Sequence, residues 1–317
     1  MNLKSIYTIE NLSELASEDL EFQQYAQLKS TEKYHVLEIF SNNKNESISN
    51  HDILYALNDG ASSLLFNFDK EENYSQILKG IYADLIPISC NYIGDNPNLF
   101  LNNWKKSWEK NNLNYSNWEG SFNVKMSPEQ TAKFSLQLPK NVRSCCIDLA
   151  ESSNLSLNDK LSFIYSTMVE MLQYASKYNL YNRFQVNWVI ADEQIESIAA
   201  LRAVRVLWAK AIKKYGVNVS DYPLWICGYT SLPKDYGNDP LNSLIFTSIQ
   251  LLSASLGGVD ECYNSSLEKD INEPRHYARH QSLVMLNETN IFVEKDSTKG
   301  SFAIEYLTHY LSKNAIS

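Results

Sequence analysis

Polar and nucleophilic side chains stand near the carboxyl ends of two apolar runs that we predict to be strands. Asp148 lies in the run RSCCIDL, Cys227 lies in the run PLWICG, and Tyr229, Thr230 and Ser231 follow at once. Catalytic residues of α/β proteins collect at the carboxyl ends of parallel strands. There a carboxylate could act as a general base, a thiol could act as a nucleophile, and the two hydroxyls could line a ligand site.

Each of these residues also has a structural interpretation. A strand-end Asp that is close to Ser152-Ser153 often caps the following helix. Cys227 has no His nearby in the sequence, so a buried core thiol is the simpler reading. We therefore treat Asp148, Cys227, Tyr229, Thr230 and Ser231 as candidates for a pocket and expect no catalytic residue.

The cysteines predict reduced thiols. There are five, an odd number, and no two of them form a C-x-x-C pair, which argues against a disulfide framework or a zinc site. Cys145 and Cys146 are adjacent, so in a strand they would face opposite sides of the sheet and both could belong to the core. We expect this chain to bind no metal.

Short apolar runs alternate with amphipathic segments along most of the chain. The predicted strands are 34–40, 61–68, 84–92, 143–149, 184–190, 223–228 and 259–263. The predicted helices are 51–58, 74–83, a helix after Ser156, a long helix capped by Asp192 and ended by Gly216, 239–256, 279–288 and 302–311. On the long helix, Arg202 and Arg205 could grip a partner or lie on a solvated face paired with Glu.

This alternation predicts βαβ units and a parallel sheet. If one more strand lies within 120–138, the count reaches about eight, which favours a (β/α)8 TIM-type barrel whose N-terminal half could be degenerate. No G-x-G-x-x-G and no G-x-x-x-x-G-K-[ST] motif is present, which disfavours a nucleotide-binding fold. We expect an N-terminal arm over 1–30 and one barrel domain over 31–317.

The charge and hydropathy of the chain exclude several kinds of partner. The net charge is −9, and nucleic-acid or anionic membrane surfaces need clustered Lys and Arg. No apolar run approaches the ~20 residues of a membrane span, and the first ten residues hold no apolar leader. We expect a cytoplasmic protein that binds neither nucleic acid nor membrane.

Four ordered segments resemble the barrel domain of methylmalonyl-CoA mutase. They are DEQIESIAALRAVRVLWAKAIKKYG at 192–216, DPLNSLIFTSIQLLSASLGGVD at 239–260, RHQSLVMLNE at 279–288 and KGSFAIEYL at 299–307. An upstream run, LNDGASSLLFNF with LKGIYADLIPIS at 57–89, resembles the small subunit of that enzyme. The resemblance covers roughly residues 50–317.

The resemblance implies an isomerase that converts methylmalonyl-CoA to succinyl-CoA in propionate metabolism, with adenosylcobalamin as the source of radicals. In the catalytic subunit of this family, coenzyme A threads the barrel axis, and a separate domain marked by D-x-H-x-x-G binds cobalt through its His. None of the five histidines here lies in that motif, and the sequence ends soon after the barrel. We expect this chain alone to bind no cofactor.

Two further motifs of the catalytic subunit are altered. Where the family has a His at the end of its fifth strand, this sequence has Asp148, an acceptor that cannot polarise a thioester carbonyl when it is ionised. Where the family has R-x-H-C-Q-T-S, this sequence reads WICGYTS at 225–231, so only Thr230-Ser231 survive. Trp225 and Tyr229 would then fill the former pocket.

We therefore interpret the chain as a non-catalytic small subunit of a heterodimeric methylmalonyl-CoA mutase. It would stabilise a larger, cobalamin-binding subunit and would be inactive alone. Two alternatives remain open: a subunit that binds acyl-CoA and contributes to a shared active site, and a binding partner that protects the mutase.

Overall fold

The computed structural model describes residues 24–27, 29, 32–42, 47–149, 155–232, 240–265, 272–294 and 296–316. In this part of the chain, one sheet contains strands β1 (His35–Asn42), β2 (Ser63–Phe68), β3 (Ile88–Tyr92), β4 (Gly120–Val124), β5 (Val142–Arg143), β6 (Cys145–Asp148), β7 (Phe184–Val189), β8 (Trp225–Tyr229) and β9 (Glu261–Tyr263). All neighbouring strands run parallel, in the order β5-β4-β3-β2-β1-β9-β8-β7-β6.

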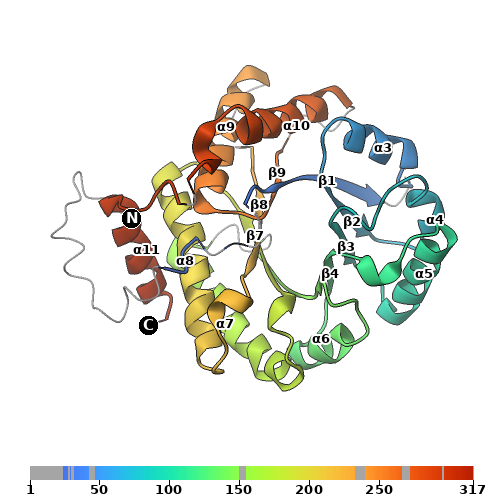
Figure 1. The fold of residues 1–317 in the computed structure, drawn as a ribbon, viewed down its shortest axis with the longest axis horizontal. Helices are drawn as coiled ribbons and strands as arrows, with labels where there is room; N and C mark the ends of the chain where they lie inside the picture. The colour runs from blue at the N-terminus through green and yellow to red at the C-terminus, as the bar shows by residue number, and fades with distance from the viewer. Residues whose placement is uncertain are drawn as a thin grey trace.

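The sheet closes into a barrel because its two end strands are consecutive in the chain. Only Ser144 separates β5 from β6, so residues 142–148 pair with β4 on one side and with β7 on the other. The nine strands therefore occupy eight positions around the barrel (Figure 1). The predicted (β/α)8 TIM-type fold is confirmed, and the strand expected within 120–138 is β4.

A helix follows each of the eight strand positions, and one more helix follows the last unit. The helices are α3 (Asn50–Asn58), α4 (Tyr74–Ile77), α5 (Pro97–Lys110), α6 (Pro128–Ser135), α7 (Leu157–Ala175), α8 (Gln194–Lys213), α9 (Pro240–Gly257), α10 (Asn272–Asn287) and α11 (Phe302–Asn314). Figure 1 shows α3 to α10 as a ring around the strands, with α11 outside α8.

Two apolar layers hold this ring on the barrel. One lies between the first strands and α3–α6, and it includes Trp104 and Trp108, which are four residues apart and share the buried face of α5. The other lies under α7, α8, α9 and α11. Both layers follow from the 3.6-residue period of the helices and the outward-facing half of each strand.

Helix α8 is buried on nearly every side because α11 packs over it. Arg202 is 2% exposed and Arg205 is 1% exposed. Arg202 Nη1 contacts Oδ1 of Asp296, which lies in the loop before α11, at 2.8 Å. Arg205 Nη2 contacts Asp260 Oδ2 at 2.9 Å. The prediction of a partner-gripping or solvated arginine pair is therefore wrong, since both arginines bind within this chain.

Two further local predictions were wrong. Helix α8 begins at Gln194 with Glu193 before it, and Asp192 instead accepts a hydrogen bond from Gln250 Nε2 at 2.6 Å. Helix α4 is a single turn, because the chain leaves the helical conformation after Ile77 and Gly80 adopts a φ of 75°, which favours glycine.

The predicted arm lies largely outside the described residues. Of residues 1–30, the structure describes 24–27 and 29, and Gln27 Nε2 donates to Leu256 O at 2.7 Å at the end of α9. The division at residue 30 stays a prediction. Among the helices of the described residues, none is both long enough and apolar enough to cross a membrane.

Candidate binding pocket at the carboxyl ends of the strands

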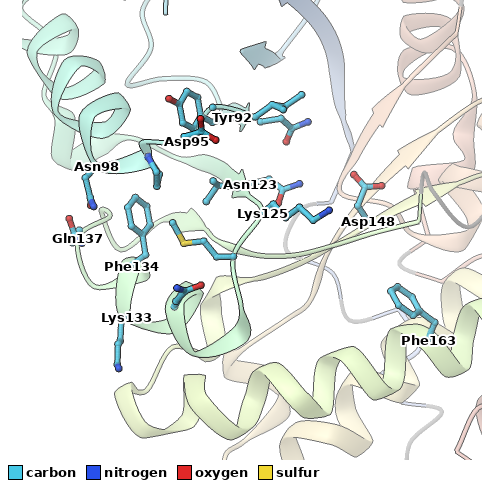
Figure 2. Close-up of a pocket in the computed structure, with 17 residues that line it drawn as sticks. Tyr92, Asp95, Asn98, Asn123, Lys125, Lys133, Phe134, Gln137, Asp148 and Phe163 are labelled. Atoms are coloured by element: carbon cyan, nitrogen blue, oxygen red, sulfur yellow. The ribbon is translucent and has the colours of Figure 1, made fainter. Parts of the chain in front are cut away.

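An open pocket of about 1280 Å³ lies at the carboxyl ends of β3, β4 and β6. Asn91 of β3, Asn123 of β4 and Asp148 of β6 line it, together with Lys125 just after β4 and side chains from α5, α6 and α7. Figure 2 shows the amino end of Lys125 directed toward the Asp148 carboxylate. The pocket occupies the face of the barrel where binding and catalytic residues of such folds collect.

Asp148 is the one predicted candidate that lines this pocket. Helix α7 begins at Leu157 and is capped by Ser156. The interpretation of Asp148 as the cap of this helix is therefore wrong. Its Oδ2 accepts from Asn187 Nδ2 at 3.3 Å, and Asn187 Oδ1 accepts from Gln185 Nε2 at 2.8 Å. The carboxylate is thus held by an amide of β7 and remains exposed at the strand end.

This hydrogen-bond chain continues into the barrel. Gln185 Oε1 accepts from Arg143 Nε at 2.9 Å, and the guanidinium of Arg143 lies 3.8 Å from the centre of the Trp225 ring. Trp225 stacks in turn on His35 of β1, with ring centres 6.1 Å apart. Burial lowers the pKa of Arg143, although the nearby Glu261 opposes this effect. Side chains of β1, β5, β7, β8 and β9 therefore meet inside the barrel.

Cys227 lies in the same interior, two residues nearer the carboxyl end of β8 than Trp225. It packs with Leu37 of β1 and Leu65 of β2, and it is 1% exposed. Burial raises the pKa of its thiol well above the ordinary value, so little thiolate forms at neutral pH. Tyr229 packs at the edge of this cluster, 6.3 Å from the Tyr263 ring. Neither side chain lines the pocket that contains Asp148.

Thr230 and Ser231 hold loops together. Thr230 Oγ1 contacts Asn264 Oδ1 at 2.9 Å and accepts from Ser265 N at 2.7 Å. Ser231 N donates to Gln250 Oε1 at 2.7 Å, which ties the end of β8 to α9. The structure therefore does not bring these two residues to the pocket beside Asp148.

The chemistry that the pocket offers is polar binding. Among the described residues that line it, none is Cys, His or Ser, so it holds no nucleophile paired with an imidazole base. It does offer the ammonium group of Lys125, the carboxylates of Asp95 and Asp148, and several side-chain amides, whereas the ammonium group of Lys133 is paired with Glu129 at 2.7 Å. Such groups suit hydrogen bonding to a polar or anionic ligand.

Sequence reasoning missed most of this pocket. Asn91 and Asn123 are each the next-to-last residue of their strand, and Lys125 directly follows the end of β4. The signal was an Asn one residue before the end of a strand, but the bounds of strand β4 could not be predicted from the sequence. Asn91 Nδ2 donates to Asn67 Oδ1 at 2.8 Å, so the amides continue across β2.

The expectation that no metal binds overlooked a second group of residues. His276 and His280 are four positions apart, and both lie on α10. The ligand atoms of these two histidines and of Asp59 lie within 4.8 Å of one another. The signal was an H-x-x-x-H spacing, which places both imidazoles on one helix face.

Fold and site together define an α/β barrel protein with a polar binding pocket at the carboxyl ends of its strands. A family model described as methylmalonyl-CoA mutase matches residues 156–317, which is half of the sequence. The chain belongs to the methylmalonyl-CoA mutase family. The matched region begins at the cap of α7 and includes α8, which lies under α11.

Individual relatives match part of the same region. A methylmalonyl-CoA mutase large subunit of Porphyromonas gingivalis is 30% identical over 138 residues, which are 42% of this chain and 19% of that protein. The methylmalonyl-CoA mutase of Escherichia coli is 29% identical over 124 residues, 38% of this chain and 17% of that protein. The aligned stretch thus spans about a fifth of the length of these curated relatives.

A comparison of folds found a crystal structure of an enolase superfamily member from Listeria innocua. It has a TM-score of 0.37 and 12% sequence identity, and the match covers 83% of this chain and 65% of that chain. A likeness of this extent carries no functional argument.

Proposed function

We propose that the chain is the non-catalytic small subunit of an adenosylcobalamin-dependent methylmalonyl-CoA mutase. It would stabilise a larger subunit that binds the cofactor and performs the isomerisation. The proposal rests on membership of the family together with one observation, the occupied barrel axis.

The barrel axis is occupied by side chains of this chain. Leu37, Leu65 and Cys227 form an apolar cluster there, and the Arg143–Trp225 stack occupies the same interior. If the coenzyme A of the catalytic subunit threads the axis, as the resemblance implies, the same path here is filled by buried groups. Opening it would separate Arg143 from Trp225 and leave a buried charge without its partners, which costs several kcal/mol by order of magnitude.

The chain's histidines also do not fit the cofactor. Cobalt ligation in the family uses an imidazole, and no described residue that lines the pocket carries one. His35 stacks on Trp225 inside the barrel, and His276 and His280 contact Asp59 between α3 and α10. We therefore place adenosylcobalamin in the partner subunit and derive no step through it here.

The surface of α9 and α10 offers a place for such a partner. These two helices pack together through Gln281, which reaches Leu244 O and Ser248 Oγ at 2.5 Å each. They expose Ile245 and Val284, at 58% and 55%. Exposed apolar side chains on neighbouring helices are typical of subunit interfaces.

One observation favours a second candidate, a subunit that binds acyl-CoA and contributes to a shared site. The pocket beside Asp148 contains Lys125, whose charge suits a phosphate group. In this case the acyl-CoA would lie across the carboxyl ends of β3, β4 and β6 and would not enter the axis.

Co-purification separates these candidates. The tagged chain is used as bait in extract of its native cells, and the isolated complex is weighed by light scattering and assayed for cobalamin. We expect a one-to-one complex with a larger cobalamin-binding subunit. The chain alone, with added adenosylcobalamin, should form no succinyl-CoA from methylmalonyl-CoA.

Either of two results would overturn the proposal. One is isomerisation by the purified chain alone, and the other is a stable chain that elutes from the extract without a partner. Binding of an acyl-CoA to the isolated chain that is weakened by Lys125→Ala would favour the second candidate over the first.

A further inference from the structure

A carboxylate and two imidazoles converge between α3 and α10, on the outside of the barrel and away from the pocket. Asp59 Oδ1 lies 2.7 Å from His276 Nδ1 and 3.2 Å from His280 Nε2. Asp59 follows the last residue of α3, and the two histidines are one helical turn apart on α10. The side chain of His280 is 50% exposed, so solvent reaches the group.

From this geometry we propose that Asp59, His276 and His280 form a binding site for a divalent transition metal ion of the zinc class. Two imidazoles and one carboxylate are a ligand set that such ions take, with water in the remaining position. Zinc bonds of ~2.0–2.1 Å in a tetrahedron separate ligand atoms by roughly 3.3 Å. The two contacts to Asp59 Oδ1 need only a small adjustment to meet that spacing.

The surrounding residues hold the carboxylate in place. Arg279 Nε donates to Asp59 Oδ2 at 2.8 Å, so it occupies one oxygen and leaves Oδ1 to the imidazoles. The charge of Arg279 is in turn met by Glu38, whose Oε2 lies 3.1 Å from Arg279 Nη1. Partners that orient a ligand in this way raise the metal affinity of natural sites.

The backbone beside Asp59 is also fixed. Gly60 adopts a φ of 102°, and a Cβ at this position would lie 2.5 Å from Leu283 Cδ1 of α10. The turn that carries Asp59 therefore sits directly against the helix that carries both histidines. A site built on a packed turn and a helix keeps its ligands close to the required geometry without the metal.

Metal titration of the purified, untagged chain tests the site. After chelator treatment, Zn²⁺ is titrated by calorimetry and Co²⁺ by visible absorption, which reports tetrahedral coordination. We expect one equivalent of either ion, and at least a tenfold loss of affinity in His276→Ala and in His280→Ala. The inference does not depend on the proposed mutase subunit, since the isolated chain is used.

His51, in the first turn of α3, provides a matched control. Its Nδ1 lies 3.2 Å from Asp52 Oδ1, and its side chain is 85% exposed, so it is a His–Asp pair without a second imidazole. His51→Ala should bind both ions as the wild type does. Thermal unfolding without metal checks that each variant is folded.

A second readout uses the position of the site. Because its ligands come from the turn after α3 and from α10, Zn²⁺ should raise the Tm of the wild type and of His51→Ala but not that of His280→Ala. The inference is overturned if the double variant His276→Ala/His280→Ala binds Zn²⁺ as tightly as the wild type. It is also overturned if Co²⁺ gives the same absorption spectrum with the wild type and with the double variant.

Discussion

Burial decides the reactivity of the thiols in this chain. All five cysteines are free, and Cys90, Cys145, Cys227 and Cys262 are buried. Burial raises the pKa of Cys145, Cys146 and Cys262 to about 12 and raises that of Cys227 well above the ordinary thiol value. Since the thiolate is the nucleophile, a raised pKa lowers reactivity at neutral pH.

Alkylation should therefore be slow in the native chain. At pH 7 to 8 we expect iodoacetamide to modify the five thiols at least ten times more slowly in the folded chain than in urea, because burial raises the pKa of each folded thiol above its ordinary value. Mass spectrometry of timed samples measures the rates. Rapid loss of the Cys227 peptide at neutral pH in the folded chain would reopen its interpretation as a nucleophile.

At the scale of the element, the pattern of strands could be predicted, but the roles of individual polar residues could not. Apolar runs gave the strand positions, because each barrel strand is buried on both faces. Nothing in those runs indicates that α11 covers α8. Because of that packing, Arg202 and Arg205 form buried ion pairs within the chain. Likewise Asp148 lines the pocket beside a segment whose strand and loop were not resolved from the sequence.

The group of Asp59, His276 and His280 shows a different limit of prediction from the sequence. The spacing of His276 and His280 is visible in the sequence, whereas their third ligand is 217 positions away from His276. Only barrel closure brings Asp59 to α10, because α3 and α10 belong to the first and last units. A local pattern can suggest two ligands on a helix, but the fold supplies the third.

Strand β4 offers a test of packing at the element scale. Gly120 adopts a φ of 137°, and a Cβ there would lie 1.9 Å from Ile88 O of the neighbouring β3. Gly120→Ala should therefore add a backbone clash to the conformational strain and lower the free energy of unfolding by more than about 3 kcal/mol, or prevent folding. Urea unfolding followed by circular dichroism measures the change.

Gly216 is the control for that substitution. It has a φ of 72° with no atom within 4 Å of the added Cβ, so Gly216→Ala introduces the strain alone. We expect a loss of about 1 kcal/mol there. Equal losses in the two variants would show that the added Cβ at position 120 does not clash with Ile88 O of β3.

At the scale of the whole molecule, the proposed subunit role predicts where the partner contacts the barrel. Ile245 of α9 and Val284 of α10 are exposed on adjacent helices, and Leu136, 55% exposed after α6, lies elsewhere on the ring. The double variant Ile245→Asp/Val284→Asp should recover at least tenfold less of the partner, because the two new charges would be buried at the interface.

Leu136→Asp is the matched control, since it places the same charge on another exposed apolar position. It should leave the recovery of the partner unchanged. Co-purification with each tagged variant, quantified by gel densitometry, measures the effect. Unchanged recovery with the double variant would exclude the α9–α10 surface as the interface, without bearing on the metal site.

The pairing of the first strand with the last constrains how the chain folds during its synthesis. β1 is hydrogen-bonded to β9, and Arg279 of α10 reaches Glu38 of β1 across 241 positions. While the ribosome is still making the last third of the chain, the β9-facing edge of β1 has no strand to pair with, and Glu38 has no arginine. An open strand edge invites pairing with other chains. The nascent chain is therefore exposed to aggregation until β9 emerges and pairs with β1.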